Sequence, residues 1–154
     1  MKHRSLFAVA ALLVLGAAAT ARGDDAPVAT GAWARATPPG ADSAAVYVTL
    51  TAGKRADRLI GASTQRAAMA HLHAVEDSGG LTRMRPLDGL DIAAGTSVVL
   101  EPQRAHIMLM GLEKAFAAGE HFPLTLHFAR GGDRIIDVLV RPAIATGPSG
   151  PQLH

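Results

Sequence analysis

Short runs in which apolar and polar side chains alternate are the feature that most restricts how this chain can fold. In AVYVTLT (45–51), Val46, Val48 and Leu50 fall on every second position. LTLHF (124–128) and RIIDVLV (134–140) alternate in the same way. Successive side chains of a strand point to opposite faces, so each run predicts a strand with one core face and one outer face. No run shows a long helical period with caps, which favours an all-β fold.

The alternating runs are separated by turn residues such as PPGAD, TAGKRA, EDSGG, PLDGLDIAAG and RGGD. Short strands with turn signals at this spacing predict an all-β sandwich or a Greek-key barrel. In GLEKAFAAG (111–119) we expect at most one helical turn. The predicted strands span 32–37, 44–51, 57–63, 68–76, 81–86, 96–101, 105–110, 124–130 and 134–141.

The first residues read as a secretory signal peptide. MKHRS is basic, the next 14 residues, LFAVAALLVLGAAA, are apolar, and small residues follow, so we expect residues 1–23 to be removed by cleavage after Ala21 or Gly23. One domain (24–142) and a flexible, Gly/Pro-rich tail (143–154) then remain. We expect an exported protein of the Gram-negative periplasm, with no membrane span in its mature form and, because no cysteine follows the apolar run, no lipoprotein anchor.

Composition excludes several function classes. The chain has no cysteine, which rules out a thiolate nucleophile, a cysteine zinc site and a blue-copper centre. Residues 1–23 hold three of the 15 basic residues and none of the 13 acidic ones, so the mature net charge is near −1. No basic patch indicates nucleic-acid binding. We find no G-x-S-x-G, P-loop or H-E-x-x-H motif and expect a protein that is not an enzyme.

HIMLM (106–110) carries an unusual outer face. If it is a strand, Ile107 and Leu109 face the core, and His106, Met108 and Met110 face the other way. A hairpin supplies a second His/Met pair: with Ser78-Gly79 at the tip of EDSGG, His73 would lie directly opposite Met84. Two imidazoles and two neutral thioethers make a soft site that selects Cu(I) over zinc, magnesium or calcium. The predicted metal ligands are His73, Met84, His106 and Met108.

The spacing of these four residues, H-x10-M-x21-H-x-M, resembles that of the periplasmic copper chaperones called PCu(A)C. AWARATPPG (32–40), DRLIGAS (57–63) and HIMLMGL (106–112) also look like that family. The resemblance implies a cupredoxin-like Greek-key β-sandwich, Cu(I) binding, and copper supply to the CuA centre of cytochrome oxidase, often beside Sco-type proteins. Some members bind further copper, including Cu(II), through a Met/His-rich tail; here the tail offers only His154, so we assign it no site.

Other candidate residues have simpler interpretations. His71 shares the expected face of His73 and is either an accessory ligand, particularly for Cu(II), or an exposed polar residue. We expect Met69 and Met110 to pack in the protein rather than bind metal, and His121 and His127 to be solvated. Two alternatives to a chaperone stay open: a periplasmic copper-buffering protein without a dedicated acceptor, and a structural sandwich whose His and Met residues are incidental.

Overall fold

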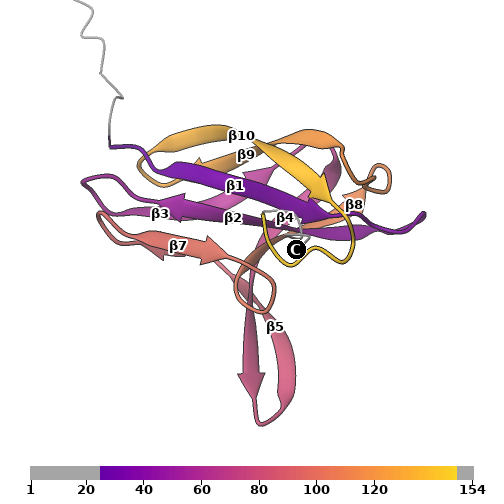
Figure 1. Ribbon diagram of the computed structural model, residues 1–154. Helices are drawn as coiled ribbons and strands as arrows, with labels where there is room; N and C mark the ends of the chain where they lie inside the picture. Colours follow the sequence, from indigo (N-terminus) through magenta and orange to yellow (C-terminus); the bar gives the residue numbers. More distant parts are fainter. Residues whose placement is uncertain (1–24, 149–154) are drawn as a thin grey trace, which may run out of the picture.

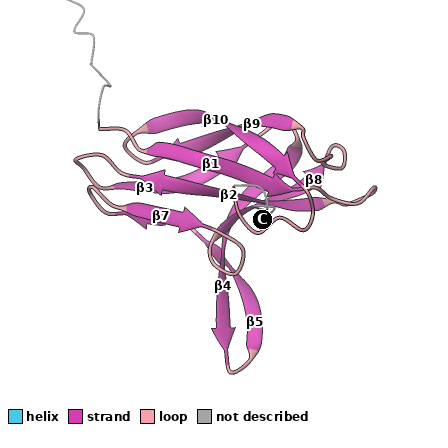
Figure 2. Cartoon of the chain, viewed as in Figure 1, coloured by secondary structure: helices cyan, strands magenta, loops and turns pink. Residues whose placement is uncertain are grey.

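Ten strands make up the regular structure of residues 25–148, the part of the chain that the computed structural model describes (Figures 1 and 2). This part contains no helix, and so none that is long and apolar enough to cross a membrane. The strands are β1 (Val28–Arg35), β2 (Ser43–Thr51), β3 (Asp57–Ser63), β4 (Ala67–Ser78), β5 (Leu81–Leu87), β6 (Leu90–Ile92), β7 (Ser97–Leu100), β8 (His106–Leu112), β9 (His121–Phe128) and β10 (Gly132–Arg141).

The strands form one continuous hydrogen-bonded path in the order β5-β4-β8-β2-β1-β10-β9-β3-β6, with β7 paired to β2. The β1–β10 pair is parallel and the other pairs are antiparallel. Figure 1 shows this path stacked into layers, from which the β4–β5 hairpin projects. The prediction of an all-β fold is therefore confirmed.

Alternation along the strands fills the core as the sequence predicts. Val46, Val48 and Leu50 of β2 are buried, and so are Ile107 and Leu109 of β8. On β9 and β10 the same rule buries alternate apolar residues, whereas Ile135 on the opposite face is exposed. Burial of one face fixes which side of each strand faces solvent. A shift of the strand register by one residue would move the apolar side chains from the core to the solvent face.

Two segments differ from the prediction. Leu90–Ile92, expected within a turn, forms the short strand β6 along β3 and buries Ile92. GLEKAFAAG contains no helical turn. Its Phe116 is buried 4.7 Å from the ring of Phe122, and the Phe116 amide donates a hydrogen bond to the Thr37 hydroxyl. Tertiary packing of one aromatic ring thus sets the path of this loop.

Residues 143–148, the first half of the expected flexible tail, lie against β1 and β2. Ala145 is buried with Trp33 and Tyr47, whose rings stand 4.6 Å apart. Arg35 Nε donates a hydrogen bond of 2.8 Å to the Ala145 carbonyl. Tyr47 is therefore covered. The predicted signal peptide (1–23) and residues 149–154 lie outside the described residues, and the limits of the domain stay a prediction.

Candidate metal site

The pairing of β4 with β8 sets histidines and methionines opposite each other at three successive positions of one face. Residues that oppose each other in an antiparallel pair point to the same face, so all six side chains share one face of the sheet. Leu72 and Ile107, one position along, are buried on the other face. The opposed pairs are His73 with His106, His71 with Met108, and Met69 with Met110.

His73 and His106 form the centre of this face. Their ring centroids are 5.8 Å apart and their planes are nearly perpendicular, at 87°. His73 Nδ1 and His106 Nε2 are buried and have no hydrogen-bond partner. A buried polar atom without a partner is costly, and a bound metal ion would satisfy both nitrogens at once. The two imidazoles therefore fit a metal that accepts nitrogen ligands.

His106 is 4% exposed and has its two ring nitrogens in different environments. Burial lowers the pKa of His106, a backbone hydrogen bond at Arg104 opposes this, and the charge of His73 lowers the pKa further. Nε2 itself has no hydrogen-bond partner. A proton held at Nδ1 leaves the Nε2 lone pair free, which is the state a metal ligand requires.

Tyr47 explains part of the burial of His106. The two rings lie 6.4 Å apart in an edge arrangement. Burial raises the pKa of Tyr47, against the charge of Arg35, so its phenol stays protonated near neutral pH. His106 also contacts the ring of His73. The ring of His71 lies nearly parallel to the ring of His73, with 6.5 Å between the two centroids. The site thus runs from a covered end at Tyr47 to an exposed end at His71.

Met84 does not lie opposite His73, so the predicted hairpin register is wrong by two residues. Val75 opposes Met84, and His73 opposes Pro86. The turn is made by Gly79 and Gly80, whose φ angles are 62° and 82°. A type I′ turn, one of the two common two-residue hairpin turns, needs positive φ at both positions, so the Gly-Gly pair was the signal for the correct register. A shift of two residues keeps Met84 on the face of His73, on the projecting hairpin, where it is 61% exposed.

The methionines of the described chain all lie on this face, and none is among the buried core residues. Met108 and Met110 are half-buried. Met69 was expected to pack, yet it is 51% exposed. Its parity on β4 decides this, because Ala70 and Leu72 take the inward positions.

Within residues 25–148 no cluster of three or more His, Cys, Asp or Glu is arranged to hold a metal ion. A metal on this face would therefore need thioether ligands in addition to the two imidazoles. Thioethers bind soft ions such as Cu(I) and hardly bind Mg²⁺ or Ca²⁺. The donor set fits Cu(I) better than it fits a hard divalent ion.

His127 belongs to a different polar group, which sequence reasoning missed. Its Nδ1 lies 2.7 Å from Asp133 and its Nε2 lies 3.0 Å from the Ser63 hydroxyl. This Ser–His–Asp order occurs in hydrolases, where the Asp is buried and backbone amides form an oxyanion hole. Here Ser63 and Asp133 are exposed. We assign these hydrogen bonds the structural role of linking β3, β9 and β10.

Solved structures with the same fold include copper proteins. The chain is 30% identical to apo-DR1885 from Deinococcus radiodurans over 94% of this chain and 95% of that one, with a TM-score of 0.60. It is 32% identical to the CuI-DR1885 structure, covering 83% and 85% of the two chains, with a TM-score of 0.61. The copper-bound PCuAC domain from PmoF2 is 22% identical, with a TM-score of 0.66 over 77% of this chain and 95% of that one, and supports the fold alone.

Residues 28–140 match the family described as "Putative lipoprotein LpqE-like". The chain belongs to this LpqE-like, PCuAC-related family. The resemblance to PCu(A)C and the cupredoxin-like fold class are thereby confirmed. A relative from Leifsonia xyli subsp. xyli, "Putative lipoprotein Lxx21020", is 33% identical over 111 residues. The match covers 71% of this PCuAC-related chain and 66% of that relative, slightly less than two thirds of its length.

Proposed function

We propose that this domain is a Cu(I)-binding metallochaperone whose ligands are His73, Met84, His106 and Met108. One observation carries the proposal: two unpartnered, buried imidazole nitrogens lie on the sheet face that holds every methionine of the described chain. Cu(I) in the similar DR1885 structure supports the choice of metal. Cu(II) is a second oxidation state to test, with His71 as its candidate accessory ligand.

The ligand chemistry suits a carrier rather than an enzyme. Four neutral ligands leave the ion with its single positive charge, which favours Cu(I) over Cu(II). His73 and His106 are held by the β4–β8 pair, whereas Met84 is on the projecting hairpin and 61% exposed. An exposed thioether can be replaced by a ligand of an incoming protein. The copper ion is thus the cargo, released by ligand exchange.

The acceptor we propose is a CuA centre of cytochrome oxidase, reached directly or through a Sco-type protein, in the periplasm. A CuA site takes up copper outside the cytoplasm, where a secreted carrier would meet it. The predicted signal peptide supports an exported protein. No basic surface pattern indicates a nucleic-acid partner.

Replacing the two sulfur ligands tests the proposal. We expect Met84→Leu/Met108→Leu to weaken Cu(I) binding by at least about 100-fold, because leucine keeps the volume and removes the soft donor. Competition with a chromogenic Cu(I) chelator under anaerobic conditions measures this. His121→Gln, at an exposed histidine hydrogen-bonded to Asp137, is the control and should bind Cu(I) as the wild type does. Equal affinities for the double variant and the wild type would favour a structural sandwich.

Delivery requires a separate measurement. The Cu(I)-loaded protein is mixed with an apo CuA domain, and formation of the coloured centre is followed after addition of an oxidant. Transfer supports the chaperone function. A loaded protein that never supplies the acceptor would instead support copper buffering.

A further inference from the structure

The β4–β8 ladder continues past the four proposed ligands. Met69 opposes Met110, and His71 lies on the same face of β4 between Met69 and His73. These three residues place two thioethers and one imidazole at two successive positions of the same face. Opposed Cβ atoms in an antiparallel pair are about 4.5–5.5 Å apart, close enough for two methionine sulfurs to reach one ion.

Packing does not explain these side chains. Met69 is 51% exposed, Met110 is half-buried, and His71 is exposed. Residues on the outer face of a strand are usually polar, and an exposed methionine opposite another methionine gains little from burial. Soft-metal binding is the chemistry that thioether sulfur offers at a solvated position.

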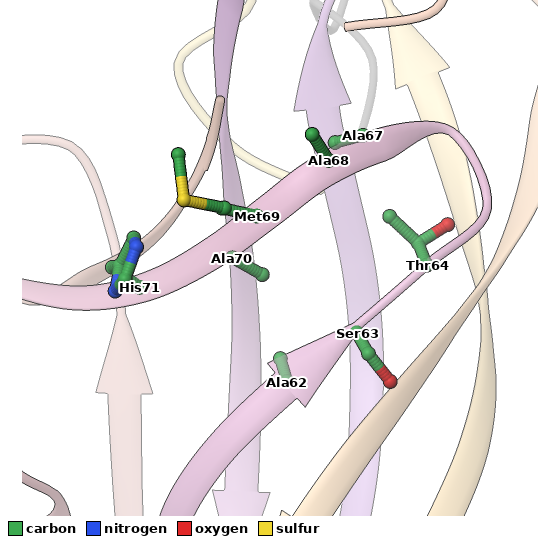
Figure 3. A pocket seen from close by; sticks show the side chains of 8 residues that line it. All are labelled: Ala62, Ser63, Thr64, Ala67, Ala68, Met69, Ala70 and His71. Carbon is green, nitrogen blue, oxygen red and sulfur yellow. The ribbon is translucent and has the colours of Figure 1, made fainter. Parts of the chain in front are cut away.

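A pocket of about 270 Å³ lies beside this end of the face. Figure 3 shows Met69 and His71 on β4 at the edge of this pocket, with Ala62, Ser63 and Thr64 on its other side. The remaining lining consists of small alanine side chains. Met69 carries its thioether on the side of β4 away from Ala62 and Ser63, and its 51% exposure leaves an ion room to approach it.

We propose that Met69, His71 and Met110 form a second, more exposed Cu(I) position. It rests on the proposed function for the identity of the metal, and it adds ligands that the H-x10-M-x21-H-x-M spacing does not contain. The ring of His71 lies 6.5 Å from that of His73, and Met108 opposes His71. Met108 therefore stands between the two positions and can contact an ion in either one. Copper enters at the exposed position and moves by ligand exchange to the pair of buried imidazoles.

Methionine methyl signals distinguish the two positions in the full-length protein. Cu(I), supplied as its acetonitrile complex without oxygen, is titrated into protein with ¹³C-labelled methionine methyl groups. The first equivalent should shift Met84 and Met108, and the second should shift Met69 and Met110. In Met69→Leu/Met110→Leu we expect loss of the second equivalent and an unchanged affinity for the first. In Met84→Leu we expect weaker binding of the first equivalent, while Met69 and Met110 still respond.

Each outcome decides between the two proposals. Saturation at one equivalent, with Met69 and Met110 unshifted, overturns the second position and leaves the proposed function intact. A Met69→Leu/Met110→Leu variant that still binds the second equivalent also overturns it. If Met84 and Met108 do not respond but Met69 and Met110 do, the proposed ligand set fails and the exposed position stands. Absence of any Cu(I)-dependent shift overturns both.

Discussion

Burial dominates the chemistry of His106. Its ring is enclosed by Tyr47 and His73, and burial lowers its pKa more than the backbone hydrogen bond at Arg104 raises it. A neutral imidazole with a free Nε2 is the result. Met84 represents the other type of proposed ligand, with an exposed side chain. A rigid nitrogen pair with an exchangeable sulfur is a combination that allows a soft ion to be both held and released.

The lowered pKa of His106 predicts how the stability of the metal-free protein depends on pH. As the pH falls through the ordinary histidine pKa of about 6.5, the unfolded chain binds a proton that the folded protein resists. The free energy of unfolding should therefore decrease with falling pH, by at most about 1.4 kcal/mol per pH unit for one proton. His106→Gln should show a shallower decrease between pH 7 and pH 5. Urea unfolding across this range measures it.

His71→Gln, which removes one exposed imidazole on the adjacent strand, is the control and should keep more of the wild-type slope. If His106→Gln and the wild type lose stability in parallel, burial of His106 does not govern its titration in the folded state.

The β4–β8 pair is the element that creates the site. Each strand alone offers a stripe of His and Met, but only their antiparallel alignment places His73 opposite His106 and Met69 opposite Met110. The two strands approach each other closely at one end of this pair, where Gly111 of β8 lies against Ala68 of β4. Gly111 has a φ of 67°, and a Cβ built on it would lie 2.8 Å from the Ala68 Cβ. Glycine therefore permits both the backbone conformation and the approach of the two strands beside Met110.

Gly111→Ala should destabilise the protein through two effects. Positive φ costs a non-glycine residue about 1–2 kcal/mol, and the contact with Ala68 adds to this. Gly95→Ala is the matched control, since Gly95 has a φ of 65° but no atom within 4 Å of the added Cβ. Thermal unfolding should show a larger fall in melting temperature for Gly111→Ala. Equal falls would mean that the strands move apart without cost.

At the scale of the whole molecule, one chain segment encloses the covered end of the site. Residues 143–148 cross β1 and β2, bury Trp33 and Tyr47, and are held by arginine side chains: Arg35 donates to Ala145, and Arg141 donates to the carbonyl of Pro148. The ring of Tyr47 in turn lies 6.4 Å from the ring of His106. The segment therefore contributes to the burial that keeps His106 neutral, although it lies far from the ligands in sequence.

Removing this segment tests its role. A chain ending at residue 142 should lose about 1–3 kcal/mol of stability, from the hydrogen bonds and the apolar contacts of Ala145. Trp33 is the only tryptophan, so its emission should move to longer wavelength on exposure. A chain ending at residue 148 keeps every described contact and should match the full-length protein. Identical emission from both truncated chains would show that the segment does not cover Trp33.

The sequence by itself determined most of the strands, their alternating faces, and the residues available for soft-metal binding, because alternation with period two is a local property. Asp57–Ser63 and the core faces of β2 and β8 were predicted correctly for this reason. Tertiary structure alone decided which strands are neighbours, and hence that His73 meets His106 and that Met69 meets Met110. It also set the path of residues 143–148. These features depend on contacts between residues distant in the chain, whose free energies no local pattern encodes.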